Sequence, residues 1–533
     1  MVAITASMIL KRLHILAQLL LYCTTSVVSY KILVAGDAGG GSHYYILERI
    51  AKALAQRDHD VTVYVSDMYT KHRQEPSLKF VTYESLVTMD EWEGLLSNIT
   101  SSYLSGEDFL SQIQSQLKAI PFVFKLMRDQ CHSALVDKQL LNQLREEHFD
   151  IIVGDFYFIC TSLLGQALDK PYVLIDSPLP TARHYSVNNN PINPSYIPAT
   201  QTGFDHQMKF VTRLMNSFQV CLEYLIGFKL FADYDHLKQI HNIKPEVSTF
   251  TTLGQAEIFF MNNDFTLDFP KPLMPNTIPV GGILTRPGKP LHPELEAFVQ
   301  GSEDGTIIFS LGGYVSIVKQ DMADMFAGAF ARLKQRVIWK QRGKTPRVTP
   351  PNVKMMEMIP QNDLLGHPNT RLLVYHCGVN GAYEAIYHGI PVICLPVFYD
   401  QPDIAQRIAS KGAGLRLDIN TVTSEILVEA IQRVLDDDSF RSNMRTLSAI
   451  FKDKPNHPAD EVALWTEYVV RHGGAGHLRS AAYDLNLLQY LLLDVILFLT
   501  ICIITVIVIM ATCCRCFVVI VKRKFCSKKV KAE

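Results

Sequence analysis

Residues 495–514 contain no charged side chain, although 19% of the 533-residue chain is charged. The run is rich in Ile, Val and Leu, and about 20 residues of α-helix cross the hydrocarbon core of a bilayer. Asp494 precedes it, and a series of lysines and arginines follows it. Because basic residues stay on the cytosolic side, we predict a transmembrane helix at 495–514, a cytosolic tail at 515–533 and a lumenal body.

Residues 1–29 have the composition of a secretory signal peptide. Lys11 and Arg12 precede an apolar run, and small residues follow before Tyr30. A basic start, an apolar middle and a small-residue cleavage site are typical of signal peptides. A lumenal body could also use the glycosylation sequon that begins at Asn98.

The cytosolic tail carries basic residues close to its end. Lys529 and Lys531 precede the final Ala-Glu pair, a pattern that fits a dilysine address for the endoplasmic reticulum. An ordinary basic cluster after a membrane helix is the alternative, and both can hold. The sequence therefore predicts a single-pass protein of the endoplasmic reticulum membrane.

Cysteine spacing and net charge argue against several classes of protein. The predicted lumenal body keeps Cys131, Cys160, Cys221, Cys377 and Cys394. Their odd number and scattered spacing predict no disulfide framework, and no Cys-x-x-Cys or His/Cys cluster indicates zinc. The formal net charge of −1 gives no indication of a nucleic-acid partner.

Short apolar runs typical of buried strands alternate with helical patterns in both halves of the body. The expected strands are residues 31–35, 61–65, 149–153, 172–175, 306–310, 336–339, 371–375 and 391–395. Strands that alternate with helices indicate parallel sheets covered by helices on both faces. Glycines and prolines at 281–296 mark a linker, so we predict two doubly wound α/β domains at 30–280 and 297–480.

Two longer helical stretches in the first half are rich in apolar residues, at 101–133 and 208–240. Apolar helical stripes usually pack on the core of a domain, and we expect this for most of these residues. A groove for an apolar ligand and a surface that touches the membrane are the alternatives.

Polar groups and glycines follow three strands of the second half. Ser310 ends one strand, His376-Cys-Gly378-Val-Asn380-Gly381 follows another, and Asp400-Gln401 comes after a third. Ligands of open parallel sheets bind outside the carboxyl ends of the strands. The three segments are therefore expected to meet at one edge of the sheet.

The segment after His376 suits a nucleotide diphosphate. Gly378 and Gly381 let a backbone approach a ligand, and Asn380 is expected to cap the helix that follows. The N-terminus of that helix offers free N–H groups and a positive dipole end to a phosphate. Glu384, about one turn along, could accept from a ribose diol. A glycine turn that merely closes a βαβ unit is the alternative reading.

The first half repeats this arrangement. Gly40-Gly41-Ser42-His43 follows the first expected strand, and Asp155 follows the strand that ends at residue 153. A histidine beside glycines is often a capping or surface residue. An aspartate at a neighbouring strand end instead favours an imidazole–carboxylate pair.

The segment from His376 to Pro391, with Pro360-Gln361 before it and Asp400-Gln401-Pro402 after it, closely resembles the signature of animal UDP-glucuronosyltransferases and their UDP-glycosyltransferase relatives. The resemblance covers essentially the whole chain. It implies a GT-B fold, in which two Rossmann-like domains face each other across a cleft. The carboxy-terminal domain would bind a UDP-sugar and the amino-terminal domain a small lipophilic acceptor.

The resemblance also implies a role for each matching residue. His43 would be the catalytic base, Asp155 would orient it, and inverting transfer would need no metal and no cofactor beyond the UDP-sugar co-substrate. In the donor site, the diphosphate would be held by His376 and by a cradle formed by Gly378, Asn380 and Gly381, and Ser310 would contact a phosphate. Gln361 would face uridine, and Glu384 would bind the ribose. The sugar would be bound by Asp400 and Gln401.

Several positions depart from the family pattern. Met358 stands where a tryptophan usually stacks on uracil, Cys377 and Gly313 replace a glycine and a serine, Lys340 replaces an arginine of glucuronosyl-transferring members, and Ile404 replaces an asparagine. These departures leave the donor open between glucuronic acid and a neutral hexose. A catalytically silent relative is the alternative function, and homo- or hetero-oligomers are possible. Asp233-Tyr-Asp235 has the DxD spacing of metal-dependent transferases, but we interpret it as helix surface.

Overall fold

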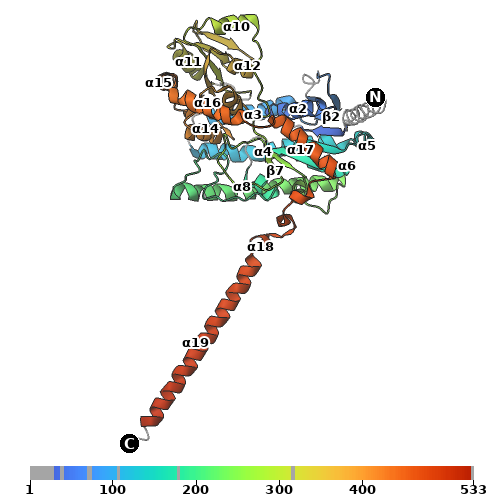
Figure 1. Ribbon diagram of the computed structural model, residues 1–533, viewed down its shortest axis with the longest axis vertical. Helices are drawn as coiled ribbons and strands as arrows, with labels where there is room; N and C mark the ends of the chain where they lie inside the picture. The colour runs from blue at the N-terminus through green and yellow to red at the C-terminus, as the bar shows by residue number, and fades with distance from the viewer. Residues whose placement is uncertain are drawn as a thin grey trace, which may run out of the picture. The chain divides into compact units, whose positions relative to one another are not determined.

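The computed structural model describes residues 29–36, 41–68, 75–104, 109–176, 181–313 and 319–529 (Figure 1). Residues 1–28 of the predicted signal peptide, Gly40 and Lys531 lie outside the described residues. The chain divides into two compact units after Leu478. The first unit holds both predicted α/β domains.

The amino-terminal domain is built on a seven-stranded sheet in which every pairing is parallel. In spatial order its strands are β3 (Lys79–Tyr83), β2 (Asp60–Ser66), β1 (Lys31–Ala35), β4 (Ile151–Asp155), β5 (Tyr172–Asp176), β6 (Phe259–Met261) and β7 (Thr277–Pro279). Parallel strands need helical crossovers and are buried on both faces. The predicted parallel sheet is confirmed, with the expected strands placed within about two residues.

Helices cover both faces of this sheet. They are α2 (Ser42–Ala55), α3 (Met89–Leu104), α4 (Phe109–Val136), α5 (Lys138–Glu146), α6 (Cys160–Leu168), α7 (Ala182–Val187), α8 (Phe210–His241) and α9 (Thr249–Gly254). Side chains of a strand alternate between faces. Ile32 and Val34 accordingly pack with α2, whereas Leu33 and Ala35 pack with α4, α6 and α8. Strand β1 thus contributes to both cores.

The carboxy-terminal domain has a six-stranded sheet that is also parallel throughout. Its spatial order is β10 (Val353–Met356), β9 (Arg336–Lys340), β8 (Thr306–Ser310), β11 (Thr370–Tyr375), β12 (Val392–Cys394) and β13 (Gly414–Arg416). Its helices are α10 (Pro293–Gln300), α11 (Gln320–Phe330), α12 (Gln361–Leu365), α13 (Val379–His388), α14 (Gln401–Ser410), α15 (Ser424–Asp436) and α16 (Asp438–Lys452). The second predicted doubly wound domain is also confirmed, although α10 begins inside the predicted linker.

The last α-helix of the first unit, α17 (Pro458–His472), follows the carboxy-terminal domain in the chain but packs on the amino-terminal domain (Figure 1). Val462 and Val469 belong to the same core as Ile32 and Val34. Glu467 accepts hydrogen bonds from the Arg57 guanidinium and lies 3.0 Å from His59 Nε2. The chain therefore returns to its first domain after completing the second.

The prediction that the body has no disulfide framework was wrong. Cys131 on α4 is bonded to Cys160 at the start of α6, and Cys377 is bonded to Cys394, with Cα–Cα distances of 5.2 Å in both pairs. The partners are 29 and 17 residues apart along the chain, but the fold places them on contacting elements. Spacing alone gave no sign of this. Cys221 on α8 is exposed and free.

The second unit contains a short 3-10 helix (Ala481–Asp484), α18 (Leu487–Tyr490) and α19 (Leu493–Lys529). Within α19, the segment Leu493–Lys524 is long and apolar enough to cross a membrane, and none of its most apolar window is buried against protein. The predicted span at 495–514 lies inside this helix.

Candidate active site

His43 and Asp155 are brought together at the carboxyl edge of the amino-terminal sheet. His43 lies in the first turn of α2, which Gly41 enters with a φ of 63°. Asp155 is the last residue of β4 and is 2% exposed. Its Oδ2 is hydrogen-bonded to His43 Nδ1, and its Oδ1 accepts the Tyr157 backbone N–H at 2.6 Å. Asp155 is thus fixed at both oxygens and leaves His43 Nε2 as the ring nitrogen that can meet a substrate.

The charge of Asp155 sets the basicity of His43. Burial lowers the pKa of His43, but the nearby Asp155 carboxylate and its hydrogen bond raise it more, and Asp400 adds to the rise. The net result is a pKa above the usual value of a histidine. An imidazole held in this way is a stronger base, and its protonated form is stabilised.

Aromatic rings line this side of the site and connect the two domains. The Tyr157 ring stands edge-on to His43, with centroids 5.5 Å apart, and is 5.0 Å from the ring of His184. Tyr399 of the carboxy-terminal domain lies edge-on to Tyr157 at 6.2 Å. Sequence reasoning missed both tyrosines. Their positions, two residues after Asp155 and one before Asp400, were the available signal.

His376 lies directly after β11, between two glycines. A Cβ atom at Gly312 would lie 2.7 Å from His376 Cε1, and one at Gly378 would lie 2.7 Å from His376 Nε2. The backbone N–H of His376 donates to the Ser310 carbonyl at 3.3 Å, and Ser310 Oγ accepts the Gly312 N–H at 3.2 Å. The glycines are therefore needed to make room for the imidazole.

His376 has the opposite electrostatics to His43. Burial lowers the pKa of His376 to about 4, and the positive charge of Lys340 adds to the lowering. Its Nδ1 atom is buried and has no hydrogen-bond partner among the described residues. The ring is therefore neutral near pH 7 and can donate one hydrogen bond to a ligand oxygen.

The N-terminus of α13 differs from the prediction in its cap. Gly378, not Asn380, is the N-cap residue, because helical geometry already begins at Val379. Asn380 lies in the first turn, where its Oδ1 accepts from Asn262 Nδ2 of the amino-terminal domain at 3.4 Å. At Gly381 a Cβ atom would lie 2.8 Å from Tyr375 Cε2, so this glycine serves helix packing.

Asp400 and Gln401 are both held by backbone N–H groups of the carboxy-terminal domain. Asp400 Oδ2 accepts the Val379 N–H at 3.1 Å, and burial together with the charge of Asp403 raises the pKa of Asp400 to about 7. Gln401 Oε1 accepts the Val397 N–H at 2.8 Å. Because the loop uses this oxygen, the amide NH2 of Gln401 is the part that can donate to a ligand.

Glu384 on α13 lies beside Gln361, the first residue of α12. Gln361 Nε2 donates to Glu384 Oε2 at 2.7 Å. Burial raises the pKa of Glu384 to about 7, against the opposing effects of that hydrogen bond and of the Arg286 charge. A partly buried carboxylate with so few donors is stabilised by any further hydroxyl that donates to it. A ribose diol would meet this requirement.

The unusual positions of the donor site have distinct surroundings. Met358 is 70% exposed, and Lys340 is half-buried at the end of β9 with its pKa lowered by burial. Cys377 has a φ of 63°, a conformation that favours glycine. Ile404 is fully buried in α14. Cys377 and Ile404 are therefore closed to a ligand, whereas Met358, Lys340 and the exposed Gly313 are open to one.

The residue after Pro402, Asp403, joins the domains. Its two carboxylate oxygens accept the backbone N–H groups of Gln201 and Gly203, each at 2.7 Å. Arg342 Nη2 and Glu93 Oε1 form a second contact between the domains at 3.1 Å. Neither pairing could be read from the sequence, because both join residues that are distant along the chain.

Other predicted sites lie outside this cluster. Asn98 is exposed on α3, while Thr100 of the same sequon is buried and donates to the Leu96 carbonyl at 2.6 Å. Asp235 accepts the Thr249 N–H at the start of α9, which gives it a structural contact. Among the described residues no group of His, Cys, Asp or Glu side chains is arranged to hold a metal ion.

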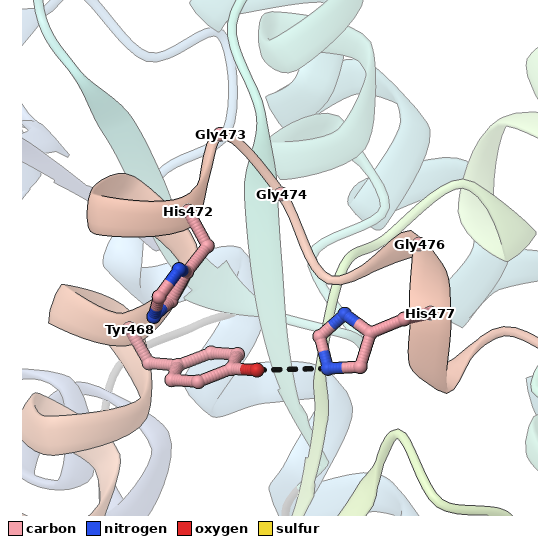
Figure 2. A pocket seen from close by; sticks show the side chains of 6 residues that line it. All are labelled: Tyr468, His472, Gly473, Gly474, Gly476 and His477. Carbon is pink, nitrogen blue, oxygen red and sulfur yellow. Dashed lines mark hydrogen bonds between the residues drawn. The ribbon is translucent and has the colours of Figure 1, made fainter.

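A separate surface pocket lies at the end of α17 (Figure 2). Its lining residues are Tyr468, His472, Gly473, Gly474, Gly476 and His477. Tyr468 Oη and His477 Nε2 are hydrogen-bonded at 2.8 Å. The lining includes none of the predicted site residues, so this pocket is not part of the candidate active site.

Two parallel sheets with a site shared between them have the architecture of the GT-B fold, and solved structures support this fold. The glycosyltransferase VinC in complex with dTDP matches with a TM-score of 0.57 and 15% identity, over 83% of this chain and 100% of that one. The calicheamicin glycosyltransferase CalG4 matches with a TM-score of 0.54 and 18% identity, over 83% and 99%. At these identities the likeness shows the fold.

Sequence comparison is more specific. The family model for UDP-glucoronosyl and UDP-glucosyl transferase matches residues 30–532, and the chain belongs to this family. Human UDP-glucuronosyltransferase 2B7 is 36% identical over 93% of this chain and 95% of its own length, and mouse UDP-glucuronosyltransferase 2A1 is 35% identical over 89% and 91%. The predicted family is confirmed, and the chain is a UDP-sugar glycosyltransferase.

Proposed function

We propose that the chain is an inverting transferase that moves glucuronic acid or a neutral hexose from its UDP-sugar to a hydroxyl of a small lipophilic acceptor. The observation that carries this proposal is the His43–Asp155 pair, whose base is raised in pKa and lies within electrostatic reach of Asp400 from the donor domain. A base and a donor-site carboxylate on opposite domains fit transfer across the interface between them.

His43 Nε2 removes the proton of the acceptor hydroxyl as the acceptor oxygen bonds to the anomeric carbon. Asp155 holds Nδ1–H, fixes the tautomer and stabilises the imidazolium that forms. The bond from the anomeric carbon to the phosphate oxygen breaks on the opposite face, so the configuration inverts and UDP departs with its electron pair. The proton is later lost from His43 to solvent.

The carboxy-terminal domain stabilises the departing diphosphate. Neutral His376 donates one hydrogen bond, and the first-turn N–H groups of Asn380 and Gly381 point along the helix dipole toward the negative charge. Ser310 adds a hydroxyl, and Glu384 with Gln361 holds the ribose and the uridine. Nothing in this sequence of steps draws on a metal.

Two features of the donor site bear on the sugar. Asp400 and the amide of Gln401 would bind sugar hydroxyls, since both lie beside the N-terminus of α13. Lys340 supplies a cation that could pair with the carboxylate of glucuronic acid, and burial lowers its pKa from the usual value of a lysine. Glucuronic acid and neutral hexoses both remain compatible with this set.

We further propose that α19 anchors the protein in the endoplasmic reticulum membrane, with the catalytic body in the lumen and the tail in the cytosol. The length and composition of residues 493–524 support the anchor. Basic residues after the span and the amino-terminal signal sequence support the orientation. Protease added to sealed microsomes should remove only the tail, and loss of the body without detergent would contradict this topology.

The decisive experiment is a panel of UDP-sugars tested against one lipophilic phenol. The panel contains UDP-linked glucuronic acid, glucose, N-acetylglucosamine, xylose and galactose, and product mass identifies the sugar that is transferred. A product from glucuronic acid or a neutral hexose supports the proposal. Tight UDP binding without any product would instead identify a silent member of the family.

A further inference from the structure

The first half of α8 has an inverted distribution of polar and apolar residues. Between residues 210 and 228, the buried positions include Asn216 and Glu223. The exposed ones are large and apolar: Phe210, Val211, Leu214, Met215, Phe218, Leu225 and Phe228, each more than half exposed. A surface helix of a water-soluble body normally buries its apolar side. This exposed set is called the α8 stripe below.

Specific hydrogen bonds hold the helix in this orientation. Asn216 Nδ2 donates to the carbonyls of Pro194 and Ile197, each at 2.8 Å, and its Oδ1 accepts the Ala199 N–H at 2.7 Å. Glu223 accepts the Ala182 N–H at 2.6 Å and both the N–H and the hydroxyl of Thr200. Rotating the stripe inward would leave these buried polar groups without partners, which is costly.

The second half of the same helix follows the normal rule. Leu230, Phe231, Tyr234 and Leu237 are buried, and most of the exposed positions from 229 to 239 are polar. The inversion is therefore confined to the first half. At 1.5 Å per residue the stripe is roughly 27 Å long, and Figure 1 shows α8 (green) as an outer helix of the body.

The exposed charges on this part of α8 are of one sign. Lys209, Arg213 and Lys229 are exposed, whereas Glu223 is the only acid between residues 209 and 229 and is buried. An apolar face bordered by cations suits the interface of a bilayer with anionic lipids. A symmetric contact between two copies fits poorly, because it would bring the same cations together without an acid.

The short connection to α19 limits how far the body can lie from a membrane that α19 crosses. Residues 479–492 connect the body to α19 and extend over no more than roughly 50 Å. We propose that the α8 stripe lies in the interfacial layer of the same bilayer that α19 enters, as a second and reversible membrane contact. This inference rests on the proposed anchoring by α19.

The contact would place a lipid surface close to the acceptor side of the active site. Glu223 holds the start of α7 through Ala182, and His184 on α7 packs against Tyr157, the neighbour of His43. A chain of contacts therefore runs from α8 through α7 and Tyr157 to His43.

The test uses the full-length protein in vesicles of phosphatidylcholine with or without phosphatidylserine. A protease site placed between residues 479 and 486 allows the body to be cut from its anchor after reconstitution, and sedimentation measures how much stays on the vesicles. We expect the cut body to stay bound. Leu214→Glu and Phe218→Glu should each weaken its binding by roughly tenfold or more, and Arg213→Gln by roughly fivefold on anionic vesicles.

Ile450→Glu is the matched control, because Ile450 is an exposed apolar residue on α16, outside the stripe. It should bind as the parent does. A second readout needs no cut: Phe218→Trp fluorescence should be quenched by brominated lipids, and Ile450→Trp fluorescence should not. Retained UDP binding in detergent verifies that each variant is folded.

Release of the cut parent body into the supernatant would overturn the proposal. So would a released body that light scattering shows to be a dimer broken by Phe218→Glu, because the stripe would then bind a second copy. If the uncut protein itself fails to sediment, the anchor assigned to α19 is wrong, and the stripe cannot act as a second contact beside it. That outcome is distinct from release after the cut.

Discussion

His43 and His376 lie at the carboxyl edges of two similar sheets, yet their surroundings drive them in opposite directions. Both are lowered in pKa by burial, but the carboxylate of Asp155 reverses this for His43, whereas Lys340 adds to it for His376. His43 is thus prepared to take a proton. His376 stays neutral and can donate a hydrogen bond to a ligand, so one residue type is prepared for two roles by its neighbours.

The largest effect should come from removing the base. His43→Ala should lower turnover on weakly acidic alcohols and phenols by roughly 10²–10⁴-fold, because a positioned base contributes about that much. UDP binding, measured by titration, should be unchanged since it depends on the other domain. A phenol that is ionised at the assay pH should be largely spared. An equal loss on ionised and un-ionised acceptors would mean that His43 positions substrate instead of taking a proton.

Removing the carboxylate of Asp155 should lower the pKa of His43 and so make its electrostatics more like those of His376. Asp155→Asn should lower turnover by on the order of 10²-fold, and the double variant with His43→Ala should lose little more than His43→Ala alone. Since Asp155 raises the pKa of His43, its loss should move the acidic limb of the kcat/KM profile to lower pH. An unshifted limb would show that another group sets the pKa.

The donor side can be tested through its carboxylate. Glu384→Ala should weaken UDP binding by roughly ten- to a hundredfold, because a hydrogen bond to a charged group is worth about 1.5–3 kcal/mol. Calorimetric titration measures this directly, and the KM for the acceptor should hardly change. An unchanged dissociation constant would place the nucleotide elsewhere.

The smallest expected effect is a dependence of uridine affinity on pH. The pKa of Glu384 is raised to about 7, and a ribose diol donates best to the ionised form. The affinity for uridine should therefore rise with pH and change by roughly tenfold between pH 6 and pH 8. Glu384→Gln should remove the trend, whereas His376→Gln should keep it because His376, with a pKa of about 4, does not titrate in this range.

The sequence predicted the two sheets well because buried parallel strands are short, apolar and clearly bounded. It also predicted that His43 and Asp155 would meet, although 112 residues separate them, because carboxyl strand ends share an edge. The helix N-terminus was predicted correctly, but the predicted cap, Asn380, was wrong, because Gly378 is the N-cap residue. The first N–H of this helix, that of Val379, donates to Asp400, a residue of another segment that local sequence does not indicate.

Other features depend on tertiary contacts that no local pattern encodes. The disulfides and the Asp403 contacts join segments whose proximity exists only in the folded chain. The α8 stripe is the clearest failure of pattern reasoning. We expected most of residues 208–240 to pack on the core, but buried Asn216 and Glu223 orient the first half of the helix the other way.

The return of α17 to the amino-terminal domain has a consequence for protein synthesis. The last strand of that domain ends at Pro279, but Val462 and Val469, which complete its core, are made only after the whole second domain. At about 5–20 residues per second, ribosomes need on the order of 10–40 s to cover that interval. During this interval the surface of the first domain that α17 later covers stays exposed. This apolar surface is where we expect chaperones to bind the nascent chain.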